Sequence, residues 1–171
     1  MARDKNLDEL LKRLALGETS ALGDVYDILA QKIYSYAMVL TRDKQRAEDV
    51  THDVFLEILG KADRILNAAN PQGFIMVMTR NRIYNLMRRD KKACFVKEVQ
   101  GRGEEPKHEE RLMLEEAFAT LPLNQQEVVF LHLICGHTQK DAAGMLGTPL
   151  VTVKWRYSKA LAALRKYFEQ N

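Results

Sequence analysis

The sequence has few of the residues that build disulfide frameworks, zinc ribbons and membrane spans. Its two cysteines, Cys94 and Cys135, lie in unrelated contexts and form no C-x-x-C pair, so neither a disulfide scaffold nor a zinc ribbon is indicated. This usage fits a reducing compartment best, and we expect a cytoplasmic protein. The N-terminal segment MARDKNLDELLKR is charged, and no hydrophobic run approaches the length of a membrane span. Secretion and membrane insertion are therefore not expected.

The alternating pattern of a half-buried strand is also missing. Apolar residues recur instead at spacings of three and four, which predicts an all-α fold. In the second predicted helix the apolar stripe is Leu22, Val25, Tyr26, Leu29, Ile33, Tyr34, Ala37 and Leu40, and in the third it is Ala47, Val50, Val54, Phe55 and Ile58. We expect Ser20 or Thr19, Asp43 and Asn70-Pro71 to cap the second, third and fourth helices, the fourth running to about Arg89.

The periodicity lapses from Asp90 to about Pro106, where lysines, glutamates and Gly101-Arg102-Gly103 predict a flexible linker. Helices resume with Leu114, Ala117, Phe118 and Leu121, and Asn124 with Glu127 resembles a capping box before another helix. A short helix from Thr138 to Leu146 and a turn at Gly147-Thr148-Pro149 precede a long final helix. The apolar face of that last helix is Leu150, Val153, Tyr157, Ala160, Leu161, Leu164 and Phe168. We therefore expect two small helical domains joined by a linker.

Charge is unevenly distributed along the chain, although the net charge is only +3. Residues 1–60 carry 8 basic and 11 acidic side chains, and residues 61–92 carry 8 and 2. Residues 93–116 carry 4 and 7, and residues 117–171 carry 6 and 3. Two basic blocks beside two acidic ones suggest separate contacts with a polyanion and with a protein surface.

The last two helices and the tight turn between them have the arrangement of a DNA-binding helix-turn-helix. At about 100° per residue, Trp155 lies roughly opposite the stripe through Val153 and Tyr157. The exposed face then holds Thr152, Lys154, Trp155, Arg156, Ser158 and Lys159. Lysine and arginine neutralise phosphates or reach guanine acceptors, and Trp155 can pack on a thymine methyl or a sugar. The alternative is an amphipathic helix with a solvated basic face.

The fourth predicted helix changes from apolar to basic along its length. Asn81, Tyr84, Asn85 and Arg88 share one face, and Arg80, Arg82 and Arg89 lie beside them. Amide, phenol and guanidinium groups together can stack on exposed bases, bond their edges and hold phosphates. A solvated face whose arginine stems cover apolar surface remains the alternative.

The third predicted helix turns Glu48, Asp49, His52, Asp53 and Glu57 away from its apolar stripe. A continuous acidic face suits docking on a basic protein surface better than metal binding or acid–base catalysis, although a plain solvated face is also possible. His132, Cys135 and His137 are the only other ligand-like group, and Cys135 also fits the core. We expect no metal, no cofactor and no enzymatic activity, since no nucleophile with its base and no phosphate loop emerges.

Three motifs in this order resemble the extracytoplasmic-function (ECF) group of the sigma-70 family over nearly the whole chain. Ala47-Glu48-Asp49-Val50-Thr51-His52-Asp53-Val54-Phe55-Leu56 resembles the polymerase-core binding motif, with His52 in place of the usual glutamine. Asn70-Pro71-Gln72-Gly73-Phe74 through Arg88-Arg89 resembles the segment that opens and reads the minus-ten element. Thr152-Val153-Lys154-Trp155-Arg156 and the segments before it resemble the minus-thirty-five binding domain, where Val151 and Trp155 depart from a usual glycine and a small polar residue.

The resemblance implies a sigma factor that directs transcription initiation, with core RNA polymerase and promoter DNA as partners. The residues implied for core binding are Glu48, Asp49, His52, Asp53, Leu56 and Glu57. Those implied for the minus-ten element are Asn67, Arg80, Asn81, Tyr84, Asn85, Arg88 and Arg89. Those implied for the minus-thirty-five element are Thr152, Lys154, Trp155, Arg156, Ser158 and Lys159. Many members of the group are held inactive by an anti-sigma factor, which would be a second protein partner.

The resemblance also sets the expected domain boundaries. Residues 1–92 would be sigma region 2, with core binding at about 48–60 and minus-ten recognition at about 61–92. Residues 93–110 would be the linker, and residues 111–171 would be region 4, with the helix-turn-helix at about 138–159. A free-standing helix-turn-helix repressor or activator is the main alternative, and it would bind a palindromic site without polymerase. An enzyme acting on nucleic acid is a third reading, weakened by the missing catalytic groups.

Overall fold

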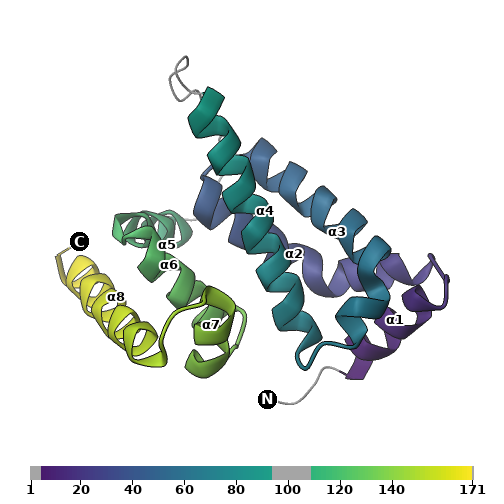
Figure 1. Cartoon of the computed structure of the whole chain (residues 1–171). Helices are drawn as coiled ribbons and strands as arrows, with labels where there is room; N and C mark the ends of the chain where they lie inside the picture. The colour runs from purple at the N-terminus through teal and green to yellow at the C-terminus, as the bar shows by residue number, and fades with distance from the viewer. Residues whose placement is uncertain (1–4, 94–108, 171) are drawn as a thin grey trace. The chain divides into compact units, whose positions relative to one another are not determined.

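The computed structural model describes residues 5–93 and 109–170, and every regular element in these two ranges is helical. In chain order the helices are α1 (Lys5–Ala15), α2 (Ala21–Thr41), α3 (Lys44–Leu66), α4 (Pro71–Ala93), α5 (Glu109–Thr120), α6 (Leu123–Val129), η1 (Phe130–Ile134), α7 (Gln139–Leu146) and α8 (Leu150–Gln170). They form two compact units, α1–α4 and α5–α8 (Figure 1). The all-helical, two-domain prediction is confirmed. Most of the predicted linker, 94–108, lies outside the described residues, as does the side chain of Leu114.

In the N-terminal unit, α3 packs against α1, α2 and α4. Every residue of its predicted apolar stripe is buried, as are the four leucines of α1. The stripe predicted for α2 is wrong at one position, because Tyr26 is 51% exposed and Tyr36 fills the core instead. Both tyrosines fit a spacing of three and four, so periodicity alone does not decide which one faces inward. Among the described helices, none is both long and apolar enough to cross a bilayer.

The helix starts of this unit follow two of the three predicted caps. The Asp43 carboxylate accepts from the backbone N–H of Arg46 at 3.0 Å, and Asn70 Oδ1 accepts from Gly73 at 2.9 Å. The third prediction, a cap by Ser20 or Thr19, is wrong, because the N-cap residue of α2 is Ser20 and it makes no side-chain cap. Its backbone is already helical (φ −60°, ψ −29°), and its hydroxyl donates instead to the Glu18 carboxylate at 3.2 Å.

In the C-terminal unit, α8 packs against α5, α6 and α7. Leu121, Val129 and Ala160 form a buried cluster, with Phe118, Tyr157 and Leu164 packed against it. The predicted inward face of α8 extends too far, since Leu161 is 37% and Phe168 43% exposed. Leu161 lies roughly 80° around the helix from Val153, which carries it off the buried side.

The predicted capping box at Asn124 and Glu127 is also wrong. The carbonyl of Pro122 accepts from the N–H groups of Gln125 and Gln126, at 2.8 and 3.0 Å, so the N-cap is Pro122 and α6 begins two residues earlier than predicted. Glu127 is consequently buried, 3% exposed, rather than reaching back to cap the helix. The next turn widens into the π-helix η1, which the sequence pattern did not indicate, and Gly136 (φ +71°) follows the end of this segment.

Candidate protein-docking and nucleic-acid surfaces

A groove of about 880 Å³ runs between α2 and α3 on the surface of the N-terminal unit. It is lined by Thr19, Leu22, Gly23, Tyr26, Asp27, Ala30, Gln31 and Tyr34 from α2 and the preceding turn, and by Glu48, Thr51, His52, Phe55 and Leu56 from α3. The centroid of the exposed Tyr26 ring lies 4.7 Å from the centroid of the Phe55 ring, and Leu56 is 53% exposed. The carboxylates of Asp27 and Glu48 lie beside these apolar groups. This α2–α3 groove therefore offers apolar contact area with an acidic margin.

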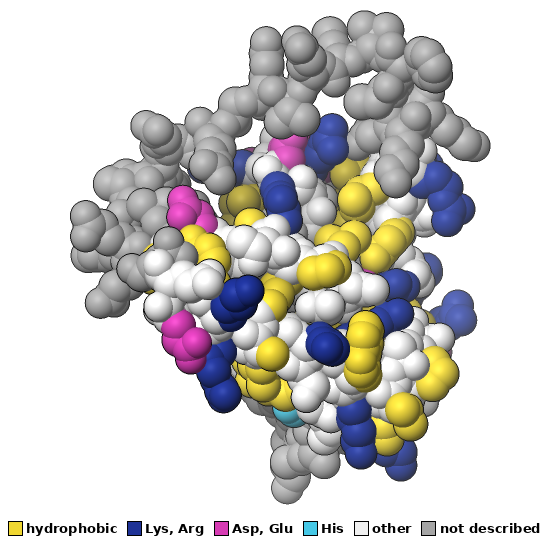
Figure 2. All heavy atoms as spheres, turned by 90° about the vertical axis from the view of Figure 1, so that its left-hand side faces the viewer, with side chains coloured by type: hydrophobic (Ala, Val, Ile, Leu, Met, Phe, Trp, Pro, Cys, Tyr) yellow, Lys and Arg dark blue, Asp and Glu magenta, His cyan; other side chains and the backbone are white. Residues whose placement is uncertain are grey.

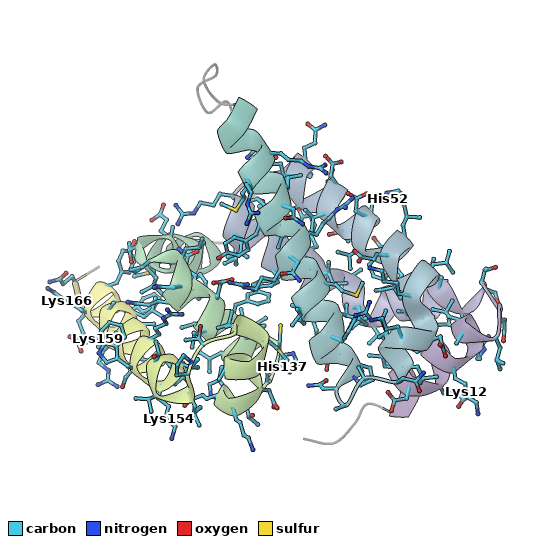
Figure 3. All side chains as sticks on the ribbon, viewed as in Figure 1. Lys12, His52, His137, Lys154, Lys159 and Lys166 are labelled. Carbon is cyan, nitrogen blue, oxygen red and sulfur yellow. The ribbon has the colours of Figure 1, made fainter. Side chains whose placement is uncertain are left out.

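The six residues predicted to bind core polymerase divide into three sets. Glu48, His52 and Leu56 line the α2–α3 groove, and Figure 3 shows His52 on the outer side of α3. Asp49 is exposed but does not line it.

The other two residues are engaged within the N-terminal unit. The Asp53 carboxylate accepts from Arg82 Nε at 3.0 Å and also from a terminal nitrogen of that guanidinium, which ties α3 to α4. Glu57 pairs with Lys61 one turn later on the same helix. The structure thus brings three of the six residues together in one groove and gives Asp53 and Glu57 partners of their own.

The basic half of α4 presents most of the residues predicted for the minus-ten element. Asn81, Asn85, Arg88 and Arg89 are exposed. The Arg80 guanidinium lies 4.5 Å from the centre of the Tyr84 ring, and both side chains are half-buried. This cation–π contact holds the two groups in a fixed relation on the face that Asn81 and Asn85 share. Amide, aromatic and cationic groups thus lie within two turns of one another.

The loop before α4 holds the remaining predicted minus-ten residue. Asn67 is exposed, and its amide donates to the Asp63 carbonyl at 2.9 Å, which satisfies the last turn of α3. Roughly 14 Å of α4 separates this loop from Arg80. The structure therefore does not place Asn67 beside the α4 side chains.

Local hydrogen bonds cap the start of α7, the first helix of the helix-turn-helix, and a glycine ends it. Thr138 and Asp141 form a capping box in which Asp141 N–H donates to Thr138 Oγ1 at 3.1 Å and Thr138 N–H donates to the Asp141 carboxylate at 3.2 Å. The Thr138 hydroxyl also donates to that carboxylate at 2.6 Å, which lowers the pKa of Asp141 although partial burial opposes the shift. Gly147, at φ +58°, ends α7 and lets the chain turn into α8.

The outer face of α8 carries the residues predicted for the minus-thirty-five element. Lys154, Trp155, Ser158 and Lys159 are exposed, whereas Thr152 and Arg156 are half-buried toward the helices behind. Figure 3 shows Lys154, Lys159 and Lys166 pointing outward from α8. Residues 142–168 contain five lysines and arginines, and neither acidic residues nor histidine. Figure 2 shows Lys and Arg side chains interspersed with hydrophobic ones on the face of the molecule that it displays.

Two exposed residues of these surfaces, Tyr26 and Val151, were not among the site residues predicted from the sequence. Tyr26 was assigned to the core, and its exposure depends on how α2 rolls against α3. Val151 is 79% exposed beside Trp155. Its position opposite Val153 and Ala160 at 100° per residue is a signal that could have placed it on the outer face.

His132, Cys135 and His137 belong to the packed interior of α6, η1 and their neighbours. Cys135 is buried, His132 Nδ1 lies 2.7 Å from the His137 carbonyl, and the His132 ring meets Tyr157 edge-on at 4.8 Å between centroids. Within the described part of the chain, no three His, Cys, Asp or Glu side chains converge as metal ligands would.

Known families and relatives match both units. The family described as "Sigma-70 region 2" matches residues 25–93, and the one described as "Sigma-70, region 4" matches residues 111–164. The ECF RNA polymerase sigma factor SigK of Mycobacterium ulcerans is 24% identical in an alignment of 175 positions that covers 95% of this chain and 94% of that protein. The ECF RNA polymerase sigma factor EcfG of Rhodopseudomonas palustris is 27% identical in an alignment of 154 positions that covers 85% of this chain and 84% of that one.

Two solved structures share the fold. The sigma factor RpoE of Bartonella quintana, in complex with the anti-sigma factor NepR, has a TM-score of 0.70 at 22% identity and matches 86% of this chain and 96% of its own. CnrH, in complex with the cytosolic domain of CnrY, also has a TM-score of 0.70, at 20% identity over 98% and 99% of the two chains. Both family matches occur in the order that the sequence motifs predicted. The chain belongs to the ECF group of the sigma-70 family and is an RNA polymerase sigma factor of transcription initiation.

Proposed function

We propose that the chain docks on core RNA polymerase through the α2–α3 groove and recognises the minus-ten and minus-thirty-five promoter elements with α4 and α8. In this proposal it performs no chemistry of its own and works in the cytoplasm. Residues 1–92 act as the core-binding and minus-ten module, and residues 111–171 act as the minus-thirty-five module.

The α2–α3 groove carries this proposal. Exposed Tyr26 and Leu56 are large apolar side chains that lose contact with water when a partner covers them, which favours association. Asp27 and Glu48 beside them favour a partner with basic side chains and steer its approach. A basic amphipathic helix of the polymerase fits this combination.

The exposed face of α4 suits single-stranded DNA. Tyr84 offers an aromatic plane, Arg80 and Arg88 offer cations, and Asn81 and Asn85 offer both donors and acceptors for base edges. Once bases leave the duplex, contacts of this kind offset an unstacking cost of a few kcal/mol per base. Sigma would thus select promoters by holding the melted strand after α8 has docked upstream.

An anti-sigma factor is a second proposed partner. Both solved relatives are complexes, one with the anti-sigma factor NepR and one with the cytosolic domain of CnrY. The α2–α3 groove provides an exposed apolar surface on which such a regulator can bind.

Co-elution with purified core RNA polymerase tests the docking proposal. We expect the wild-type chain to co-elute at moderate salt, and a Glu48→Lys plus Leu56→Asp variant to lose at least about tenfold in affinity. Both side chains are exposed, so the variant should stay folded. Glu9→Lys, at an exposed site on α1, is the matched charge reversal and should leave binding unchanged.

Two outcomes would contradict the proposal. Equal co-elution of all three proteins would show that polymerase binds elsewhere. Failure of the wild type to bind polymerase, together with tight duplex binding by the chain alone, would favour a free-standing repressor.

A further inference from the structure

Val151 and Trp155 form an apolar ridge along the outer face of α8. They are 79% and 56% exposed, and four residues of helix place them about 40° apart. Both lie in the first two turns of the helix, the part of a recognition helix that contacts base edges. Covering these side chains removes apolar area from water, which favours the binding of a partner at this ridge.

Cations flank this ridge on both sides. At about 100° per residue, Lys154 and Arg165 lie along one side and Lys159 and Lys166 along the other. Two rows of positive charge match the two phosphate backbones that border a DNA groove. With the flanking lysines on phosphates, the ridge between them faces the floor of the groove.

The floor of the major groove displays one apolar group, the 5-methyl of thymine. We propose that Val151 and Trp155 read thymine methyl groups in the upstream promoter element, so that this chain selects thymine at one or two fixed positions. The inference rests on the proposed binding of DNA by α8 and adds which base the ridge selects and by which atom.

Replacing thymine by deoxyuridine tests the methyl contact, because the two bases differ in that group alone. The preferred upstream duplex is first selected from a randomised pool with the polymerase holoenzyme containing this chain. Each thymine of the selected site is then changed to deoxyuridine, one at a time, and holoenzyme affinity is measured. We expect a loss of roughly fourfold at one or two positions, the value of one buried methyl group.

Substitutions of the two ridge residues test whether the ridge makes the methyl contact. With Val151→Ala or Trp155→Ala, the ratio of thymine to deoxyuridine affinity at those positions should fall to about one. Leu161→Ala is the matched control, because Leu161 is an exposed apolar residue of α8 that lies roughly 100° from the ridge. That variant should keep the wild-type ratio. All three sites are exposed, and thermal unfolding of each variant verifies that the fold is retained.

The outcomes separate this inference from the proposed function. If the wild type binds thymine and deoxyuridine duplexes equally at every position, the methyl contact does not exist. A methyl dependence that survives both ridge substitutions would place the contact elsewhere and overturn the assignment. Loss of self-association in the ridge variants, with DNA affinity unchanged, would instead mark the ridge as a contact between copies. Holoenzyme that forms but selects no upstream sequence would refute DNA recognition by α8 itself.

Discussion

Asp53 illustrates how one carboxylate can belong to the fold although its sequence motif suggests a docking surface. Its bonds to Arg82 join α3 to α4, and both side chains remain partly exposed, 34% and 43%. Exposed ion pairs contribute little to stability. We expect Asp53→Asn to lower the free energy of unfolding by less than about 1 kcal/mol. The affinity of the Asp53→Asn variant for core polymerase should change by less than about threefold, whereas the affinity of Glu48→Lys should fall about tenfold.

Chemical denaturation and polymerase titration measure these two effects separately. An Arg82→Gln variant should reproduce the small stability loss, and the double variant should show no additional cost beyond one substitution. If Asp53→Asn weakened polymerase binding as much as Glu48→Lys, the carboxylate would contact the partner directly.

Asp141 gives a pH dependence with a definite sign. Its folded pKa is lowered by the Thr138 hydroxyl, so the ionised carboxylate stabilises α7 at any pH above the ordinary value of 3.8. That contribution is lost as the pH falls from 3.8 through the lower folded pKa. Asp141→Asn should cost about 1 kcal/mol near neutrality and progressively less in acid. Unfolding by denaturant over a pH series measures the difference.

Glu169→Gln is the matched control for this series, since Glu169 is an exposed carboxylate near the end of α8. It should change stability little at any pH in the series. A constant penalty for Asp141→Asn down to the most acid pH would show that hydrogen-bond geometry, not ionisation, carries the effect.

The sequence predicted correctly which groups of side chains lie on the outer faces of α4 and α8, but it misplaced single side chains at the edges of the apolar faces. The exposed cations, Trp155 and the amides of α4 are placed as the helical period predicts. Tyr26 was misjudged because it sits at the boundary of the apolar face of α2, where a roll of a few tens of degrees moves a side chain between core and surface. That roll is set by tertiary packing, which no local pattern contains. Glu127 was misjudged for another reason, the earlier start of α6.

At the scale of the element, α7 offers two glycines with opposite expected behaviour. Gly144 lies within the helix, and a Cβ added there meets no atom within 4 Å. Gly144→Ala should therefore raise the free energy of unfolding by about 0.5–1 kcal/mol. Gly147 lies in open space as well, but its φ of +58° is strained for alanine, so Gly147→Ala should be destabilising by about 1 kcal/mol.

Thermal unfolding of the two variants tests the assignment of this turn. Because both substitutions add one methyl group at an uncrowded site, a difference in sign isolates backbone conformation from packing. Two stabilising substitutions would mean that the helix-turn-helix does not need the left-handed conformation at Gly147.

The presence of the helices was predictable from the sequence, but their exact ends were less so. Asp43 and Asn70 cap as expected because their side chains act within a few residues. The start of α6 and the π-helix η1 were not foreseen, since Pro122 supplies a backbone carbonyl rather than a side chain. A wide turn in an apolar run such as Phe130–Ile134 leaves no compositional trace.

At the scale of the whole molecule, each unit has its own core. Leu29, Ile33 and Ile58 are among the fully buried side chains of the N-terminal unit, and the cluster around Leu121 and Ala160 serves the C-terminal one. We expect separately expressed fragments 1–98 and 99–171 to fold as helical proteins with cooperative unfolding transitions. Circular dichroism and thermal melts measure this. A fragment without a cooperative transition would show that its core needs the rest of the chain.

The proposed docking surface and the proposed DNA surfaces differ in charge. Basic blocks at residues 61–92 and 117–171 supply the proposed DNA surfaces, and the acidic block before residue 60 supplies the margin of the docking groove. This pattern was readable from the sequence. The groove itself was not, because the sequence pattern placed Tyr26 in the core, whereas the structure exposes it on the groove beside Phe55.

The stretch without acidic residues, 142–168, also sets the sign of the charge that α8 presents to a partner. Carboxylates, which would cancel positive charge locally, are absent from this stretch. Its five lysines and arginines therefore give it one sign of charge throughout. In the proposed complex this charge attracts phosphate and repels a basic protein surface, so it would steer α8 toward DNA and away from the kind of partner proposed for the α2–α3 groove.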